Sequence, residues 1–265
     1  MPIQSPAPFS HFPIDAARRV LGVMTDIDDT LTTAGAVTPD ALDALARLRT
    51  AGLPVVAITG RPMGWSLPFA RAWPLAAVVA ENGAVALFPD GRVEYAQDAT
   101  TRHANAARLR EVAAQIVREV DGAHLARDSA GRVTDIAVDH AEFAHLSASD
   151  IDRVLALMRS HGMNASVSSI HINGWFGAHD KLSGAHWIVE RLLGRSLAGE
   201  SARWVYVGDS TNDQALFGAF ESSVGVANLM DFADRLSVWP AYLTQAARGA
   251  GFAEVAAALI AARAA

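Results

Sequence analysis

Short apolar runs alternate with longer helical stretches from about residue 20 onward. The apolar runs Val20–Asp26, Val55–Thr59 and Leu75–Ala80 predict buried strands. Between them, helices are predicted over 39–52 and 62–73, each with a proline at its start. Because strands joined by crossover helices pair in parallel, the pattern predicts an α/β fold with a Rossmann-like parallel sheet.

The pattern changes after Asn82-Gly83. Val85–Phe88 and Val93–Tyr95 flank a Pro-Asp-Gly turn and predict a hairpin. An αββαββ succession follows, with helices predicted over 102–120 and 150–161 and strands over 124–127, 133–139, 165–168 and 170–173. We therefore expect a small α+β domain, residues 97–177, inserted into the sheet domain.

The first pattern resumes near Lys181. Helices are predicted from Lys181 to Leu193, from Thr211 and from Phe252, and strands over 204–207 and 224–227. The sheet domain is thus expected to be discontinuous, 15–96 and 178–265. Residues 1–14 contain four prolines and lack the basic stretch and apolar core of a signal peptide, so they predict a loose N-terminal arm.

Composition narrows the class of protein. With 51% hydrophobic and 19% charged residues among 265, the chain can bury a core and is not disordered. The absence of cysteine excludes disulfides, thiolate zinc sites and a cysteine nucleophile, and it suits a cytoplasmic protein. A net charge of −6 argues against nucleic acid as a partner, and no apolar run has the length of a membrane helix. We expect a soluble, cytoplasmic protein.

Acidic side chains follow two of the predicted strands. Asp26 and Asp28 follow the first strand in the run DIDDTLT, and Asp209 and Asp213 follow the strand 204–207 in GDSTND. In open parallel sheets, ligands bind beyond the carboxyl ends of the strands. Carboxylates that meet there repel one another, and a divalent cation such as Mg2+ relieves that repulsion.

Two further features favour phosphate. Thr59 and Gly60 end the second strand in ITGR, before a helix whose N-terminus attracts phosphate oxygens. Lys181 opens a helix, where a cation opposes the helix dipole, so a negative partner is expected beside it. Each feature alone has an ordinary explanation, since acids and threonines cap helices and most lysines are solvated. Their succession at strand ends favours a phosphate site.

Together these four stretches resemble the motifs of the haloacid dehalogenase superfamily: DxDxT, a strand-terminal Thr or Ser, a Lys or Arg, and an acidic GDxxxD pair. Here they read DIDDTLT, ITGR, Lys181 and GDSTND, in the family's order. The insertion before Lys181, preceded by Glu81-Asn82-Gly83-Ala84, is similar to the type II, subclass B cap of the Cof-type and sucrose-phosphate phosphatase-like members. The resemblance implies a Rossmann-like core with an inserted cap domain.

The resemblance also implies roles for individual residues. Asp26 would be the nucleophile that forms an aspartyl-phosphate, and Asp28 would be the general acid and base. The phosphate ligands it implies are Thr59, Gly60, Lys181 and Asn212. The Mg2+ ligands it implies are Asp26, the backbone carbonyl of Asp28, Asp209 and Asp213, the last through water or as a residue that orients Lys181.

Three more residues are candidate contacts with the substrate or the cap: Arg61, Trp65 and Trp175. Trp65 follows the second motif, and Trp175 precedes the return of the chain to the sheet domain. The alternatives are ordinary packing for the two aromatic residues and pairing with a neighbouring carboxylate for Arg61.

These features favour a Mg2+-dependent phosphatase that hydrolyses a small phosphorylated metabolite, a sugar phosphate above all. A phosphomutase of the phosphomannomutase type would use the same phosphoenzyme. A non-catalytic receiver-like module would also gather acids, a threonine and a lysine around an aspartate, although the second acid and the long insertion argue against it. We expect a small-molecule partner and a monomer or homodimer.

Overall fold

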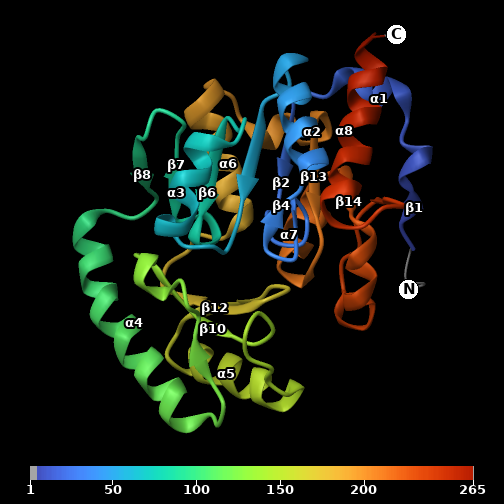
Figure 1. Cartoon of the computed structure of the whole chain (residues 1–265). Coiled ribbons are helices and arrows are strands. Elements are labelled where there is room, and N and C mark those ends of the chain that lie inside the picture. Colours follow the sequence, from blue (N-terminus) through green and yellow to red (C-terminus); the bar gives the residue numbers. More distant parts are fainter. Residues whose placement is uncertain (1–4, 265) are drawn as a thin grey trace.

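The computed structural model describes residues 5–264. A nine-stranded sheet lies above a four-stranded sheet in the view of Figure 1. We call the nine-stranded sheet with its helices the core, and residues 99–175, which include the four-stranded sheet, the cap. The core strands are, in sheet order, β1 (Ala7–Pro8), β15 (Tyr242–Leu243), β14 (Ser222–Gly225), β13 (Trp204–Gly208), β2 (Gly22–Thr25), β5 (Val55–Ile58), β6 (Ala77–Ala80), β7 (Val85–Leu87) and β8 (Val93–Tyr95).

The centre of the core sheet is parallel. β2 lies between β13 and β5, and β6 follows β5, all in parallel register. β14, β15 and β1 continue the parallel arrangement on one side, while β7 and β8 add an antiparallel edge on the other. The predicted α/β fold with a Rossmann-like parallel sheet is confirmed.

Helices cover both faces of the core sheet. On one face are α1 (Ile14–Arg19), α2 (Pro39–Thr50), α3 (Met63–Ala72) and α8 (Arg248–Ala264), and on the other are α6 (Lys181–Leu193) and α7 (Gln214–Ala219). Successive strand residues point to opposite faces, so that Val23 packs in the first hydrophobic cluster and Met24 in the second. Burial on both faces explains the continuous apolar runs of these strands.

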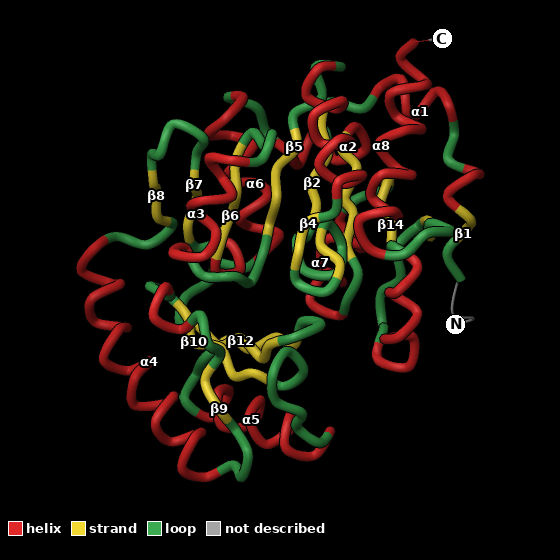
Figure 2. Tube along the Cα trace, viewed as in Figure 1, coloured by secondary structure: helices red, strands yellow, loops and turns green. Residues whose placement is uncertain are grey.

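The cap sheet is antiparallel and follows the predicted αββαββ succession. Its strands are β11 (Asn164–Val167), β12 (His171–Trp175), β10 (Asp135–Asp139) and β9 (His124–Leu125), in sheet order. Helices α4 (Ala99–Glu119) and α5 (Ala148–Ser160) pack on one face through a hydrophobic cluster of their own. In Figure 2 the cap sheet lies between α5 and the core.

The cap face that is turned to the core is polar. Ile136, Val138 and Ile172 belong to the hydrophobic cluster under the helices. Their alternate neighbours Asp135 and Asn173 are buried polar residues, and they contact each other and core residues. The two-residue period of a strand therefore divides the cap sheet into an apolar face for its helices and a polar face for the core.

The predicted helices and strands agree with the structure in type and order, and their ends shift by a few residues. For example, α8 begins at Arg248 rather than Phe252. The strands β1 and β15 and a hairpin of β3 (Thr32–Thr33) with β4 (Ala36–Val37) are additional. The domain boundaries at 97 and 177 stay predictions. Within residues 5–264, every helix is too short or too polar to cross a membrane.

The prediction of a loose N-terminal arm is wrong for its described part. β1 pairs in parallel with β15, and Phe9 is only 3% exposed. The ring of Phe12 lies 5.3 Å from that of Phe9 and 5.1 Å from that of Tyr242, centroid to centroid. Prolines are compatible with an edge strand, so their presence did not exclude pairing. Residues 1–4 of the predicted arm lie outside the described residues.

Candidate active site

Asp26 lies directly beyond β2. Its backbone N–H donates to the carbonyl of Val207 (2.9 Å), so pairing with β13 continues one residue past the strand. The carboxylate is buried and accepts a 2.8 Å hydrogen bond from Nζ of Lys181. Because parallel strands end at one edge of the sheet, Asp209 and Asp213, which follow β13, reach the same place.

Lys181 is the first residue of α6. Asp180 caps this helix by accepting from the backbone N–H of Ser183 (2.7 Å), and the Ser183 hydroxyl accepts from the Asp180 N–H (2.8 Å). Nζ of Lys181 donates to Asp26 (2.8 Å) and to Asp213 (2.7 Å). These two carboxylates supply the negative charge that a lysine at a helix N-terminus requires.

Asp213 is held by four donors. Its Oδ1 accepts from Lys181 and from the hydroxyl of Tyr206 (2.5 Å). Its Oδ2 accepts from the backbone N–H groups of Asp209 (3.0 Å) and Ser210 (3.2 Å). Gly208 makes room for this arrangement, because a Cβ there would overlap the Asp213 carboxylate. Asp213 is thus a fixed partner for Lys181.

Asp26, Asp209 and Asp213 form a buried group that we call the carboxylate cluster. Each offers an oxygen within 4.8 Å of the others. Burial raises the pKa of Asp26 to about 7, opposed by the charge of Lys181 and assisted by that of Asp213. Burial and the charge of Asp26 also raise the pKa of Asp209. For Lys181, burial favours a lower pKa, but the charges of Asp213 and Asp26 outweigh it and raise the pKa.

The carboxylate cluster fits a divalent metal ion. Its donors are hard oxygens, which Mg2+ prefers, and Lys181 alone cannot neutralise three carboxylates. Burial raises the pKa values of Asp26 and Asp209, and the charges of the neighbouring carboxylates raise them further. Both oxygens of Asp213 already accept hydrogen bonds, which favours its role in orienting Lys181 over direct metal binding.

Thr59 and Gly60 follow β5 at the same edge of the sheet. The Thr59 hydroxyl is buried and accepts from the backbone N–H of Arg61 (3.0 Å). The Gly60 carbonyl accepts from Arg132 (3.0 Å) and Asn173 (3.3 Å) of the cap. Asn212 is half-buried and accepts from the Ser210 hydroxyl (2.9 Å) instead of contacting the carboxylate cluster in this structure.

Asp28 is paired with Arg61. The Arg61 Nε and Nη2 atoms lie 2.9 to 3.1 Å from the Asp28 carboxylate oxygens. The same guanidinium donates to Asp128 and Glu142 of the cap, and it lies 4.8 Å from the ring centroid of Trp65. Of the alternatives for Arg61, pairing with a carboxylate is the one that the structure contains.

The comparisons with known proteins agree with this geometry. Residues 23–119 match the family model of the haloacid dehalogenase-like hydrolases. Over these residues, the chain is similar to the haloacid dehalogenase-like hydrolases. This confirms the resemblance that the four sequence motifs carried. No curated protein sequence matches the chain.

Solved structures with a similar fold cover almost the whole chain. The sucrose-phosphatase of Synechocystis sp. PCC6803, solved with sucrose and phosphate, is 18% identical with a TM-score of 0.65 over 91% of this chain and 98% of its own. The C-terminal domain of Candida albicans trehalose-6-phosphate phosphatase is 12% identical with a TM-score of 0.68 over 97% and 98%. A HAD/COF-like hydrolase from Plasmodium vivax is 16% identical with a TM-score of 0.68 over 94% and 99%.

Trp175 contacts the segment that precedes Lys181. Its indole N–H donates to the carbonyl of His179 (2.7 Å), and its ring stacks on the His179 ring at 6.0 Å. It thus fixes the segment in which the chain returns from the cap to the core. Trp65 packs on Phe69, with ring centroids 4.5 Å apart, as well as on Arg61.

Sequence reasoning missed residues that hold the cap on the core. Glu81, directly after β6, is fully buried and accepts from the backbone N–H groups of Val133 (3.0 Å) and Thr134 (2.6 Å) in the cap. The sequence signal that could have identified Glu81 is its position directly after a strand, which it shares with Asp26. Asp128 and Glu142 lie in irregular segments of the cap, where the sequence pattern gives no signal.

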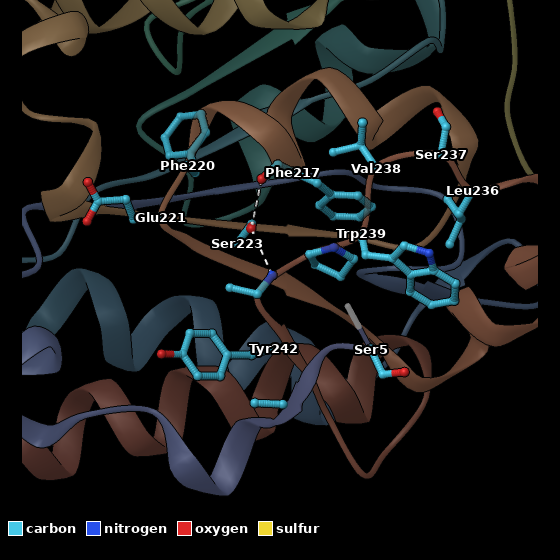
Figure 3. A pocket seen from close by; sticks show the side chains of 13 residues that line it. Ser5, Phe217, Phe220, Glu221, Ser223, Leu236, Ser237, Val238, Trp239 and Tyr242 are labelled. Atoms are coloured by element: carbon cyan, nitrogen blue, oxygen red, sulfur yellow. Dashed lines mark hydrogen bonds between the residues drawn. The ribbon is translucent and has the colours of Figure 1, made fainter. Parts of the chain in front are cut away.

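A large cavity of about 800 Å³ lies elsewhere in the protein (Figure 3). Its lining includes Phe217, Trp239 and Tyr242. Ser223 donates to the Phe217 carbonyl (3.0 Å) and accepts from the backbone of Ala241 (3.1 Å) beside it. These residues lie near the starts of β14 and β15, whereas the carboxylate cluster follows strand ends. None of the sequence-predicted site residues lines this cavity.

Proposed function

We propose that this protein is a Mg2+-dependent phosphatase that acts on a small phosphorylated metabolite, most of all a sugar phosphate. One observation carries the proposal: Lys181 joins Asp26 and Asp213 inside the buried carboxylate cluster at the ends of parallel strands. This arrangement suits a nucleophilic carboxylate that receives a phosphoryl group.

In the proposed reaction, a carboxylate oxygen of Asp26 attacks phosphorus, and the bond to the leaving alcohol breaks. Asp28 gives a proton to that alcohol and later takes one from the water that hydrolyses the aspartyl-phosphate. The non-bridging phosphoryl oxygens are held by Thr59, Gly60, Lys181 and Asn212. Mg2+, when bound by Asp26, Asp209 and the Asp28 carbonyl, supplies positive charge that offsets the carboxylates and the phosphate.

We propose that residues 97–177 act as a cap domain that selects the substrate, on a catalytic core of 15–96 and 178–265. The polar contacts of Arg61, Glu81 and Gly60 with cap residues support a cap that docks over the carboxylate cluster. The names of two structural neighbours, sucrose-phosphatase and trehalose-6-phosphate phosphatase, support a sugar phosphate as the substrate. The cysteine-free sequence supports a cytoplasmic location.

The test is phosphate release from a panel of sugar phosphates and other phosphate monoesters, with added Mg2+ or with EDTA. We expect release only with the metal, and a loss of about 10³-fold or more in Asp26→Asn, because the nucleophile is gone. Asp121→Asn, at an exposed position, should behave as the unchanged protein. Full activity of Asp26→Asn, or transfer of the phosphoryl group to a hexose instead of water, would overturn the proposal.

A further inference from the structure

Arg61 connects three carboxylates that come from three separate segments. Its Nε and Nη2 contact Asp28 of the core at 2.9 to 3.1 Å. Its Nη1 donates to Asp128 of the cap (3.2 Å), and its Nη2 also donates to Glu142 of the cap (2.8 Å). We call these four residues the Arg61 network. All three guanidinium nitrogens are therefore in use, and one edge faces the core while the other faces the cap.

The guanidinium is held in one place. The Arg61 side chain is 6% exposed, and the Trp65 ring packs beside it. An arginine presents its donors in a rigid planar fork, so a shift of one edge moves the other. A flexible surface arginine would not transmit position in this way.

The two cap carboxylates are themselves fixed within the cap. Glu142 accepts from His171 of β12 (2.9 Å, between Oε2 and Nε2), and its backbone N–H donates to Asp139 at the end of β10 (2.9 Å). Asp128 accepts from Arg132 at 3.1 Å. The positions of both carboxylates relative to Asp28 thus depend on where the cap sheet lies.

We propose that Arg61 is a positioning residue that makes the orientation of the Asp28 carboxylate depend on docking of the cap. With the cap docked, Asp128 and Glu142 fix the outer edge of the guanidinium, and the inner edge fixes Asp28. When the cap moves away, the guanidinium loses Asp128 and Glu142, two of its three partners. Arg61 is then no longer fixed in one place, and neither is the Asp28 carboxylate that it contacts. The inference rests on the proposed function, in which Asp28 serves the leaving group and the water.

The test separates formation of the aspartyl-phosphate from its hydrolysis. The substrate is p-nitrophenyl phosphate, whose leaving group departs as a stable anion and needs no proton. Attack by Asp26 then depends little on Asp28, whereas hydrolysis still needs Asp28 as a base. In Arg61→Ala, we expect a rapid release of about one equivalent of p-nitrophenolate per enzyme, followed by turnover lowered by about 10²-fold. Asp28→Asn should behave in the same way, and Asp26→Asn should lose both phases.

Two further variants keep the test independent of folding. The double variant Asp128→Asn with Glu142→Gln leaves Arg61 and Asp28 in place, and it should lower turnover by about tenfold while retaining the rapid phase. Arg61→Lys keeps the charge but not the fork, so it should stay impaired. Millimolar guanidinium should restore part of the turnover of Arg61→Ala. Arg118→Ala, at an exposed position of α4, is the control with unchanged kinetics.

The outcomes distinguish this inference from the proposed function. If the unchanged protein releases no phosphate from any monoester, the proposed function fails. If it does, but Arg61→Ala and the double variant both turn over normally, the positioning role is wrong. Loss of the rapid phase in a folded Arg61→Ala would also overturn it, because Arg61 would then act on phosphate binding. Full activity of Arg61→Lys would also overturn the positioning role, because a positive charge without the planar fork would then be sufficient.

Discussion

Gly208 is a residue at which the candidate site leaves no room for a side chain. A Cβ on Gly208 would overlap the carboxylate of Asp213, which is held by Lys181 and Tyr206. The strand residues around Gly208 are buried and closely packed, so they cannot make room for a methyl group there. The Asp213 carboxylate therefore has to move. If the Asp213 carboxylate moves, Lys181 keeps only Asp26 of its two carboxylate partners.

We therefore expect Gly208→Ala to lower turnover by about 10²-fold and the free energy of unfolding by about 1–3 kcal/mol. Phosphate release and urea unfolding measure the two effects. Gly199→Ala is the matched control, because nothing lies within 4 Å of a Cβ at that position. Equal losses in the two variants would show that the fit at Gly208 is not the cause.

The sequence predicted the acids and the lysine of the site, and Asp213 as a partner that orients Lys181, but it did not identify the other contacts of these residues. Asp26, Asp209 and Lys181 could be placed because each stands at the end of a strand or the start of a helix, and topology brings such positions together. The hydrogen bond from Tyr206 to Asp213 and the pairing of Arg61 with Asp28 depend on side-chain directions. No spacing along the chain encodes those directions.

Among the secondary-structure elements, the long buried strands were predicted more readily than the short strands at the sheet edge. The strands β2, β5 and β13 are buried on both faces and read as apolar runs. The two-residue strands β1 and β15 are too short to show a period. They form because β14 offers a sheet edge to pair with. Such long-range pairing cannot be seen in the local sequence pattern.

The N-terminal strand gives a prediction about stability. Phe9 follows β1 and belongs to the core cluster, so Phe9→Ala should lower the free energy of unfolding by about 3–5 kcal/mol. Urea unfolding measures it, and kcat should stay unchanged in the folded protein because Phe9 is remote from the carboxylate cluster. Phe143→Ala removes a ring that is 56% exposed and should cost far less. A similar cost for both would contradict the packing role of β1.

At the scale of the whole molecule, buried ion pairs join the cap and the core. Glu142 is a cap residue of these pairs whose pKa the structure shifts. Burial favours a higher pKa for Glu142, but hydrogen bonds from His171 and Arg61 outweigh it and lower the pKa to about 2. The ionised form is therefore favoured in the folded protein relative to the unfolded chain, where the pKa is about 4.5.

A pH dependence of stability follows. The contribution of Glu142 is fully present above pH 4.5 and is lost as the pH falls toward 2. At neutral pH, we expect Glu142→Gln to be less stable than the unchanged protein by about 2 kcal/mol, and the difference to shrink in acid. Urea unfolding of both proteins across this pH range measures it, with the exposed Glu111→Gln as control. A difference that stays constant with pH would contradict the assignment.

The position of β2 in the core sheet has a consequence for synthesis of the chain. β2 is made early, yet one of its two neighbours is β13, which follows the entire cap in sequence. Until β13 emerges from the ribosome, the apolar strand that carries Asp26 has an unpaired edge, and unpaired apolar edges promote aggregation. Folding of the nascent chain therefore depends on slow, long-range pairing of β2 with β13. A chaperone that shields the edge of β2 during synthesis would protect the strand that precedes Asp26 until the candidate site has formed.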